Sequence, residues 1–278
     1  MPAAPMQHSG LNIVVCIKQV PHAENLIIDP VTKTLRREGV KAVINPPDEN
    51  ATELALQLKD KHGGHITVIT MGPPSAISAL QDLLAKGADD AILLSDRAFA
   101  GADTYPTSLT LAWVIAMLDE QHKVDLVICG EETTDSSTAH VGPGIAEHLD
   151  IPQATFIESL EVDPSKGIAR AKRMLEGAYE IVEFPLPGVV TASFNMNVPR
   201  KATLTGKVRS KKARVPTWTA ENLQMPREWI GLKGSPTSVG KIDTQESEFR
   251  NCDLLSGKDL EEVSKKLVKG LVDKGVLQ

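Results

Sequence analysis

Apolar runs alternate with amphipathic segments along the first half of the chain. Between the runs lie segments whose apolar residues recur at helical spacing, and the first of these segments ends at Gly63 and Gly64, which suit a helix C-cap. The runs are short and rich in β-branched residues, which is typical of strands buried on both faces; they are residues 12–18, 65–71, 91–96 and 124–130. This alternation predicts an α/β fold with a parallel sheet and right-handed crossovers.

Two segments depart from this pattern. Residues 25–39 hold two short extended pieces around a Pro-containing turn, which predicts a hairpin flap inserted after the first strand. Residues 156–194 alternate at period two around a turn at residues 163–167, which predicts antiparallel strands that extend or cover the sheet.

The last third of the chain has little periodicity. From about residue 200 it is basic, then rich in Pro and Gly, and a final amphipathic helix is expected at residues 259–275. A segment with so little core of its own is expected to pack on another chain. We therefore expect a disordered lead at residues 1–10, an α/β domain at 11–200, and a docking loop with a C-terminal arm at 201–278.

Composition narrows the possible functions. A net charge of -6 over 278 residues argues against a general nucleic-acid binder, which usually carries a basic face. Cys16, Cys129 and Cys252 lie far apart without metal-ligand spacing, so no metal site is expected. The cysteines are expected to be reduced, and residues 1–10 show neither a signal-peptide nor a transit-peptide pattern. Both features favour a cytoplasmic location. No apolar run approaches the ~20 residues of a membrane span.

Ligands of open parallel sheets bind at the carboxyl ends of the strands, near a switch in strand order. Four segments are expected at that edge: residues 16–18, 45–50, 71–75 and 130–149. Each of the last three joins an extended segment to the start of a helix. The free N–H groups and the positive dipole end of such a helix attract an anion.

The segment at residues 130–149 is the strongest candidate. Thr138 can cap the following helix, and Gly142 and Gly144 place no side chain between the backbone and a ligand. Groups suited to ribose or ribityl contacts come from Asp135, Ser136, Ser137 and Thr138. An ordinary capped helix after a polar loop explains the same residues equally well, and neither the dinucleotide fingerprint nor the P-loop is present.

The other candidate segments also have simpler interpretations. Asp48 could be a plain N-cap, with the preceding prolines setting the helix entry. His140 could contact a ligand through its backbone N–H, and acid–base catalysis by its side chain is not expected. The basic run at residues 209–214 could be a nucleic-acid patch, but the acidic net charge favours a solvated or partner-facing run. No Ser/His/Asp or Cys/His set stands out.

Six stretches of the chain occur in the order and spacing of a known family. They read NIVVCIKQVP, NPPDENATELALQLK, TMGPPSA, LLAKGADDAILLSD, VDLVICGEETTDSSTAHVGPGIAEHL and PRKATL. From about Leu11 onward the sequence resembles the β subunit of electron transfer flavoprotein. The resemblance implies a Rossmann-like nucleotide-binding sheet, a heterodimer with an α subunit that carries FAD, and a C-terminal arm on that partner. It also implies a second nucleotide in this chain, which is AMP in respiratory members and FAD in bifurcating members.

The resemblance also implies which residues contact that nucleotide. They lie at the end of the first strand, in the Asn-Pro motif, before Gly-Pro, and in the loop that would cradle the phosphates. In this sequence they are Cys16, Asn45, Pro46, Pro47, Asp48, Met71, Gly130, Thr133, Thr134, Asp135, Ser136, Ser137, Thr138, Ala139, His140, Val141 and Gly142.

The same loop bears on the choice between FAD and AMP. Respiratory members typically carry an Asp-Asp-Asp run followed by Gln-Thr-Gly-Gln, whereas this chain carries Thr-x-x-Val-Gly-Pro from Thr138 to Pro143. That form is similar to the bifurcating group and implies FAD, with NADH as electron donor or acceptor. The departures are the stretch TTDSS at residues 133–137, where that group more often has a Gly between its acidic residues, and His140, where Gln is common. AMP in a respiratory-type carrier is the alternative, and a stand-alone nucleotide-binding module is disfavoured by the long C-terminal arm.

The resemblance also names redox partners. It implies an acyl-CoA dehydrogenase and, for bifurcation, ferredoxin or another low-potential acceptor, so that the chain would be a carrier subunit of an NAD-dependent flavoprotein complex. An exposed loop is expected at residues 199–206, where Leu204 is the only large apolar residue. From the residues alone, Leu204 is expected to fold back onto the sheet. The family instead uses a leucine here to anchor on the dehydrogenase.

Overall fold

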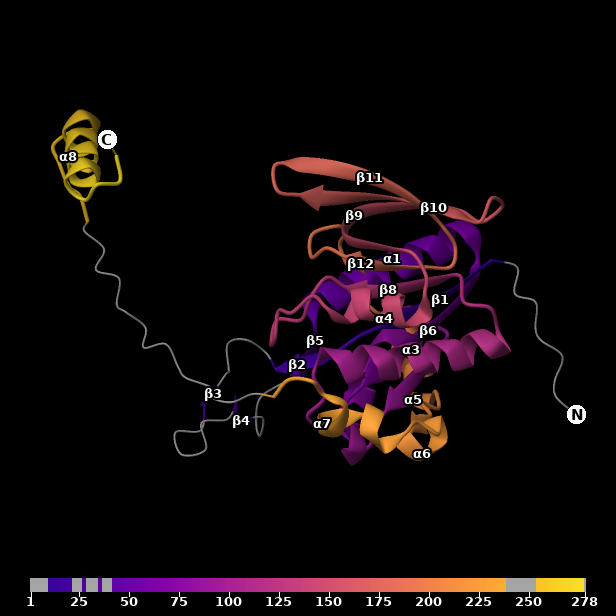
Figure 1. The fold of residues 1–278 in the computed structure, drawn as a ribbon. Helices are drawn as coiled ribbons and strands as arrows, with labels where there is room; N and C mark the ends of the chain where they lie inside the picture. The colour runs from indigo at the N-terminus through magenta and orange to yellow at the C-terminus, as the bar shows by residue number, and fades with distance from the viewer. Residues whose placement is uncertain (1–9, 22–26, 29–34, 37–41, 239–253, 278) are drawn as a thin grey trace, which may run out of the picture. The chain divides into compact units, whose positions relative to one another are not determined.

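The computed structural model describes residues 10–21, 27–28, 35–36, 42–238 and 254–277 (Figure 1). The chain divides into two compact units, residues 1–240 and 241–278. Residues 1–9 of the predicted disordered lead at residues 1–10, most of the flap and Cys252 lie outside the described residues. The paired short strands β3 (Ile27–Ile28) and β4 (Leu35–Arg36) are antiparallel, as a hairpin requires.

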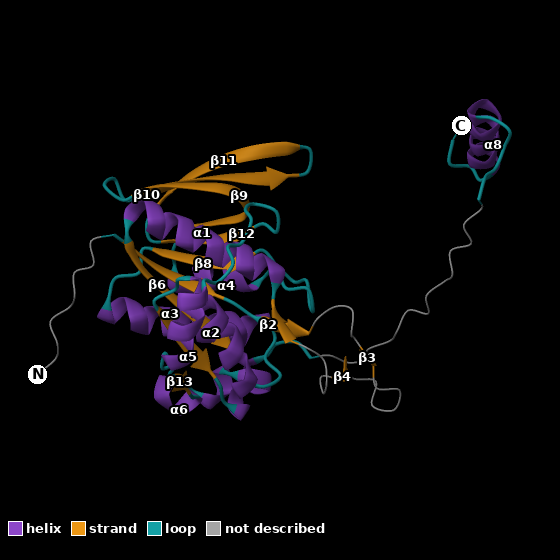
Figure 2. Cartoon of the chain, turned by 180° about the vertical axis from the view of Figure 1, so that it is seen from behind, coloured by secondary structure: helices purple, strands orange, loops and turns teal. Residues whose placement is uncertain are grey.

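A nine-stranded sheet forms the centre of the first unit, and its middle is parallel as predicted (Figure 2). The middle strands, in spatial order, are β12 (Gly188–Ala192), β8 (Leu126–Gly130), β1 (Leu11–Cys16), β6 (Gly64–Met71) and β7 (Asp90–Leu94). The chain builds outward from β1 through β6 to β7, then returns to β8 and β12 on the other side. The strand order therefore reverses between β1 and β8, as in a doubly wound Rossmann-like sheet.

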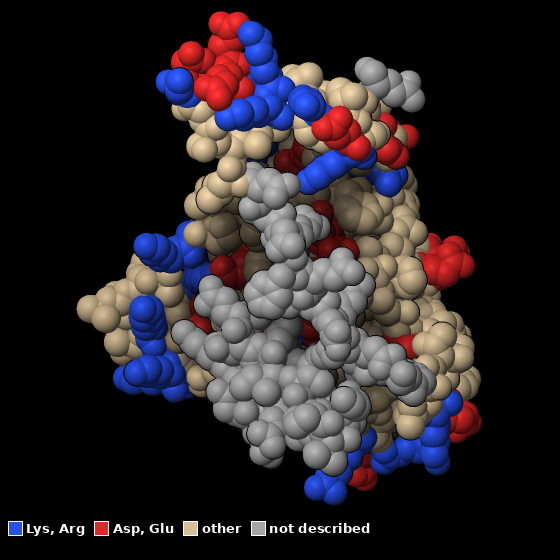
Figure 3. Space-filling view, turned by 90° about the vertical axis from the view of Figure 1, so that its left-hand side faces the viewer, with Lys and Arg blue, Asp and Glu red and all other residues tan. Residues whose placement is uncertain are grey.

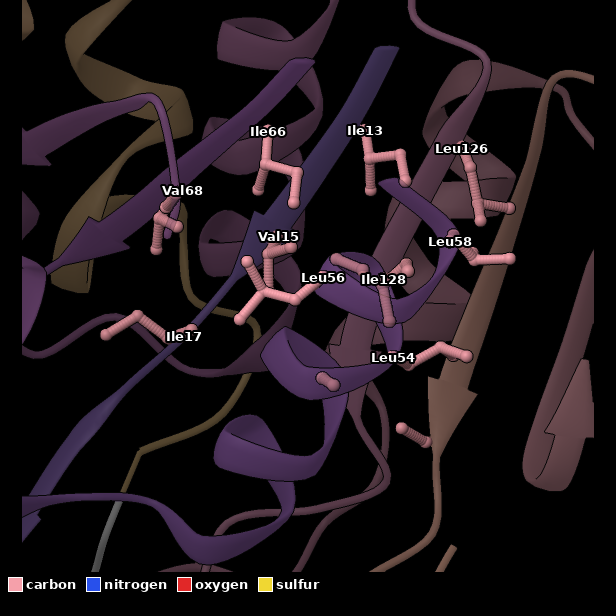
Figure 4. Packing of buried hydrophobic residues seen from close by; sticks show 14 of the residues in the cluster. Ile13, Val15, Ile17, Leu54, Leu56, Leu58, Ile66, Val68, Leu126 and Ile128 are labelled. Carbon is pink, nitrogen blue, oxygen red and sulfur yellow. The ribbon is translucent and has the colours of Figure 1, made fainter. Parts of the chain in front are cut away.

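Helices cover both faces of this sheet. Helices α1 (Pro46–His62) and α2 (Ile77–Lys86) contribute to the buried cluster on one face, and α3 (Thr104–Gln121) and α4 (Val141–Leu149) to the cluster on the other. Figure 4 shows α1 side chains such as Leu54 lying over β1, β6 and β8. Strand β1 sends Val15 to the first cluster and Val14 to the second, as the pleat of a strand covered on both faces dictates.

The strands after residue 152 only partly match the prediction. Strands β9 (Gln153–Asp163), β10 (Ile168–Leu175) and β11 (Ala178–Pro185) pair antiparallel, as expected. The prediction of an antiparallel strand was wrong for β12, which lies inside the sheet and runs parallel to both β9 and β8. All five residues of β12, including the polar Thr191, are buried, as expected for a strand covered on both faces.

The predicted end of the α/β domain at residue 200 is too early. The next elements are α5 (Leu204–Lys212), β13 (Thr217–Trp218), α6 (Ala220–Leu223), the 3₁₀ turn η4 (Arg227–Trp229) and α7 (Gly231–Gly234). Strand β13 pairs with β7 at the sheet edge, and Leu223 and Ile230 are buried in the cluster under α3. These elements are short and each buries only one or two residues or none, so the sequence pattern did not reveal that this segment packs against the core.

The second unit contains helix α8 (Leu260–Asp273), which confirms the amphipathic helix expected there. The carboxylate of Asp259 caps it by accepting a hydrogen bond from the backbone N–H of Glu262 at 2.9 Å. No α8 residue is buried, and Leu260, Leu267 and Val272 are exposed on the helix.

Within the described part of the chain, no helix combines the length and apolarity that a membrane crossing requires.

We predict that Leu223→Ala destabilises the protein by about 2–5 kcal/mol, because it opens a cavity at a side chain that is only 2% exposed. The matched control is Leu232→Ala at a side chain that is 63% exposed, where the change in free energy should stay within about 0.5 kcal/mol. Urea unfolding measures both. Equal midpoints for the two variants would show that residues 220–232 are not part of the core.

Candidate functional site

The carboxyl ends of β1 and β8 lie side by side where the strand order reverses, with Cys16 paired to Cys129 in register. Residues 16–18 continue from one strand, and the loop of residues 131–140 leads from the other into α4. Doubly wound sheets bind their ligands at such a point. Figure 3 views the molecule from the side on which β2 (Gln19–Pro21) lies in Figure 1 and shows both acidic and basic side chains on that side.

Asn45 forms hydrogen bonds that hold this edge of the sheet in shape. Its side chain is fully buried, and its amide Nδ2 donates to the backbone oxygen of Glu132 at 2.8 Å and to Asp48 Oδ1 at 3.0 Å. Its Oδ1 accepts a hydrogen bond from the backbone N–H of Thr134 at 3.1 Å. The amide therefore joins the start of α1 to the loop that follows β8 through three hydrogen bonds.

Asp48 joins the same helix to β1. Its Oδ2 accepts a hydrogen bond from the backbone N–H of Lys18 at 2.6 Å. Burial raises the pKa of Asp48 to about 7, against the lowering effect of hydrogen bonds from Asn45, Lys18 and Gly130. A Cβ on Gly130 would collide with Asp48 Oδ1, so glycine is needed for this close approach.

The interpretation of Asp48 as an N-cap was wrong. Asn45 occupies the N-cap position of α1, and Pro46 and Pro47 fill the first helical positions. Asp48 is the third helical residue, and its side chain turns toward the end of β1 instead of the free N–H groups of its own helix.

The loop after β8 forms a tight turn. The backbone N–H groups of Ser136 and Ser137 both donate to the Thr133 oxygen, and the hydroxyls of Thr133 and Ser136 lie 2.7 Å apart. Ser137 and Ala139 have positive φ values of 46° and 56°, which few residues other than glycine adopt. The turn leaves an exposed run of polar residues at Thr134, Asp135, Ser136 and Ser137.

Helix α4 starts without a side-chain cap. Its N-cap residue is the exposed His140, which makes no capping hydrogen bond, so the prediction that Thr138 caps this helix was wrong. The N–H groups of the first turn, which begins at Val141, therefore lack a side-chain acceptor. Such a helix start can hold an anion.

The glycines of this helix serve packing. A Cβ on Gly142 would collide with the Thr191 methyl group of β12, and one on Gly144 would press on the Ser108 side chain of α3. Protein atoms occupy the space that a side chain would take, so packing alone requires glycine at both positions, and the predicted close approach of a ligand stays a prediction.

The remaining predicted residues also lie at this edge. Cys16 and Cys129 are free, buried thiols, and their mutual hydrogen bond together with burial raises the pKa of the Cys16 thiol. Met71 ends β6 and is half-buried. The sequence placed Lys18 at this edge, within residues 16–18, but gave it no role, because a lone lysine after a strand has no distinguishing pattern. Its Nζ lies 2.8 Å from Asp135 Oδ1.

The fold and this edge define a doubly wound α/β protein with an uncapped helix at its switch point. The electron transfer flavoprotein domain matches the chain over residues 32–223. The chain therefore belongs to the electron transfer flavoprotein family, among its β subunits. Beta subunits of this family pair with an α subunit.

Three relatives illustrate the similarity. The chain is 49% identical to the electron transfer flavoprotein subunit beta of Clostridium acetobutylicum, over 85% of this chain and 89% of that one. It is 45% identical to the subunit of the same name from Thermoanaerobacterium thermosaccharolyticum, over 96% and 100%. It is 39% identical to the caffeyl-CoA reductase-Etf complex subunit CarD of Acetobacterium woodii, again over 96% and 100%.

We predict that Gly142→Ala costs about 1–3 kcal/mol of stability, because the new methyl group overpacks the contact with Thr191. Adding Thr191→Ser should restore most of this loss. Serine removes the clashing methyl group but keeps the hydroxyl that accepts a hydrogen bond from the backbone N–H of Phe156 at 2.9 Å. The free energy of unfolding of the two single variants and the double variant measures the coupling. Strictly additive losses would mean that another contact requires the glycine.

Proposed function

We propose that this chain is the β subunit of a heterodimeric carrier that moves electrons between NADH and an acyl-CoA dehydrogenase through an FAD held by this subunit. The supporting observation is the run from Thr138 to Pro143, whose bifurcating-type sequence lies at the uncapped start of α4. Flavin-based bifurcation, with a low-potential acceptor such as ferredoxin, fits that sequence form. The respiratory-type carrier with AMP is the second candidate.

The residues at the switch point fit an adenine nucleotide. The free N–H groups at the start of α4 suit phosphate oxygens, and the exposed groups of Asp135 and Ser136 suit ribose or ribityl hydroxyls. Asn45 and Asp48 act behind them, since their hydrogen bonds hold the loop and the end of β1 in place. An FAD bound there would supply two-electron exchange with NADH and one-electron transfer.

The relative from Acetobacterium woodii supports the choice of partner class. Its name places it in a complex of an electron transfer flavoprotein with a caffeyl-CoA reductase. Electron exchange with an enzyme that acts on an acyl-CoA is therefore the activity we propose for this chain as well. The cytoplasmic location and the ferredoxin partner stay predictions.

We predict two FAD molecules per heterodimer, one from each subunit, when the chain is co-expressed with its α subunit and the cofactors are released and quantified. Rapid mixing with NADH should then bleach the flavin absorbance. One FAD together with one AMP, and no bleaching, would assign the chain to the respiratory class. The absence of any adenine nucleotide beyond the α-subunit FAD would contradict the nucleotide site itself.

The proposed docking site for the dehydrogenase is the start of α5. The expected loop ends at Thr203, whose Oγ1 accepts a hydrogen bond from the backbone N–H of Gly206 at 3.0 Å and caps the helix. Leu204 does not fold back onto the sheet, since it is 80% exposed. Val208, one turn later on the same face, is also exposed.

The rest of this segment is anchored from both sides. A Cβ on Gly206 would collide with the backbone oxygen of Ala85 in α2, so α5 packs closely there. The Arg200 guanidinium donates to both carboxylate oxygens of Glu53 in α1, at 2.9 and 3.0 Å, and to Asp60 at 2.8 Å. Leu204 therefore projects from a fixed support, which lowers the entropy cost of docking.

We predict that Leu204→Ala weakens binding to the acyl-CoA dehydrogenase about 30- to 150-fold, the loss expected when a buried leucine anchor of roughly 2–3 kcal/mol is removed. Stability and cofactor content should stay unchanged, because the side chain is exposed in this chain. Val198→Ala is the matched control, since Val198 is 87% exposed and lies just before the segment that Arg200 anchors to α1. Titration of the dehydrogenase against both variants measures the difference, and equal affinities would place docking elsewhere.

The C-terminal arm is proposed to bind the α subunit. Helix α8 carries an apolar stripe with no buried residue, so its amphipathic face has no core within the described part of its own unit. Burial of such a stripe against another chain is the usual reason for an amphipathic helix of this kind.

A further inference from the structure

The backbone of Lys18 is fixed, while its side chain has freedom to move. Its N–H donates to Asp48 Oδ2 at 2.6 Å, and its carbonyl oxygen accepts a hydrogen bond from the backbone N–H of Asn45 at 2.9 Å. The side chain is 42% exposed. The ammonium group can therefore change partners without moving the strand end that carries it.

The ammonium group spans the switch point. Lys18 Nζ lies 2.8 Å from Asp135 Oδ1, so the residue after β1 is paired with the loop after β8. Burial alone would raise the pKa of Asp135, but the hydrogen bond and the charge of Lys18, together with hydrogen bonds from Thr133 and Ser136, outweigh it and lower that pKa. The contact is therefore a true ion pair at neutral pH.

The loop itself supplies no Lys or Arg side chain that could pair with a phosphate. Residues 131–142 include Glu131, Glu132 and Asp135 and contain no Lys or Arg. Among the ion pairs of the described residues, Lys18 supplies the one cation in contact with this loop. A phosphate entering at the start of α4 would be repelled by the carboxylates and attracted to this ammonium group.

The ion pair is also easy to exchange. Partly exposed ion pairs contribute little to stability, because water screens the charges and side-chain entropy opposes the pairing. A nucleotide phosphate carries more negative charge than one carboxylate and offers several acceptor oxygens, so it competes well for the same ammonium group.

We propose that Lys18 binds the phosphate of the incoming nucleotide and that Asp135 holds its ammonium group in place until the nucleotide arrives. This inference rests on the nucleotide site of the proposed function. It adds a binding residue and a partner exchange: the Lys18–Asp135 ion pair breaks, and a Lys18–phosphate pair forms. The contrasting role is a permanent brace, in which the ion pair only holds the loop closed.

The test uses the heterodimer with its α subunit, with the β-site nucleotide removed, and compares AMP, FAD and adenosine by titration calorimetry. Lys18→Gln should weaken AMP and FAD about 10- to 100-fold, the loss expected for a charge-assisted contact, and leave adenosine, which has no phosphate, unchanged. It should also flatten the salt dependence of AMP binding. Asp135→Asn keeps a side-chain oxygen for the ribose but removes the competing charge, so its preference for AMP over adenosine should be at least as large as that of the unaltered protein.

Two controls accompany these variants. Lys18→Arg keeps the cation and should retain most of the AMP affinity. Lys59→Gln breaks an ion pair with Asp89 of 2.6 Å near the C-terminal end of α1, and should leave AMP binding unchanged. Thermal unfolding of each variant confirms that the comparison is made between folded proteins.

Two results would overturn the exchange. In the first, Lys18→Gln and Asp135→Asn weaken AMP and adenosine equally, which is the behaviour of a brace. In the second, Lys18→Gln binds AMP as well as the unaltered protein does. If the unaltered heterodimer binds neither AMP nor FAD, the nucleotide site of the proposed function fails, and the exchange fails with it. Normal binding by the unaltered protein confines any failure to the role of Lys18.

Discussion

The site depends on the hydrogen bonds that tie the start of α1 to the ends of two parallel strands. Asn45 holds the loop after β8, and Asp48 holds the backbone after β1. Adjacent parallel strands place their ends together but do not fix the loops that leave them. These two buried side chains supply that constraint, and the shape of the exposed turn at residues 133–137 follows from it.

A buried carboxylate at this position has an energetic cost. Removal of Asp48 from water opposes its ionisation, and the donors around it oppose its protonation, which leaves its pKa near 7. Groups balanced in this way are more frequent at functional edges than in cores, where an apolar residue of similar size would serve better. The partly exposed ion pair between Lys18 and Asp135 lies just outside this buried junction, where exchange of partners is easier than in a core.

The same helix connects the candidate nucleotide site to the proposed docking segment. The first turn of α1 carries Asn45 and Asp48 at its start, and further along the helix Glu53 binds Arg200. Asn50 and Asn197 also exchange side-chain hydrogen bonds with each other's backbone oxygens, at 2.8 and 3.0 Å. One rigid element thus positions both regions, so the distance between the candidate nucleotide site and the exposed Leu204 is set by a helix and not by a flexible loop.

The sequence by itself determined the alternating α/β core, the antiparallel hairpins and the amphipathic α8, because burial on one or both faces leaves a period in the chain. It also marked the residues of the switch-point loop. Only the tertiary structure decided that β12 enters the sheet, that residues 204–234 pack against the core, and that Gly142 serves a contact with Thr191. It also decided that the side chains of Asn45 and Asp48 form hydrogen bonds with the backbone of the loop after β8 and of the end of β1. The ion pair between Lys18 and Asp135 was likewise visible only in the structure. These are contacts between residues far apart in the chain, and no local period or propensity records which distant groups a side chain will meet.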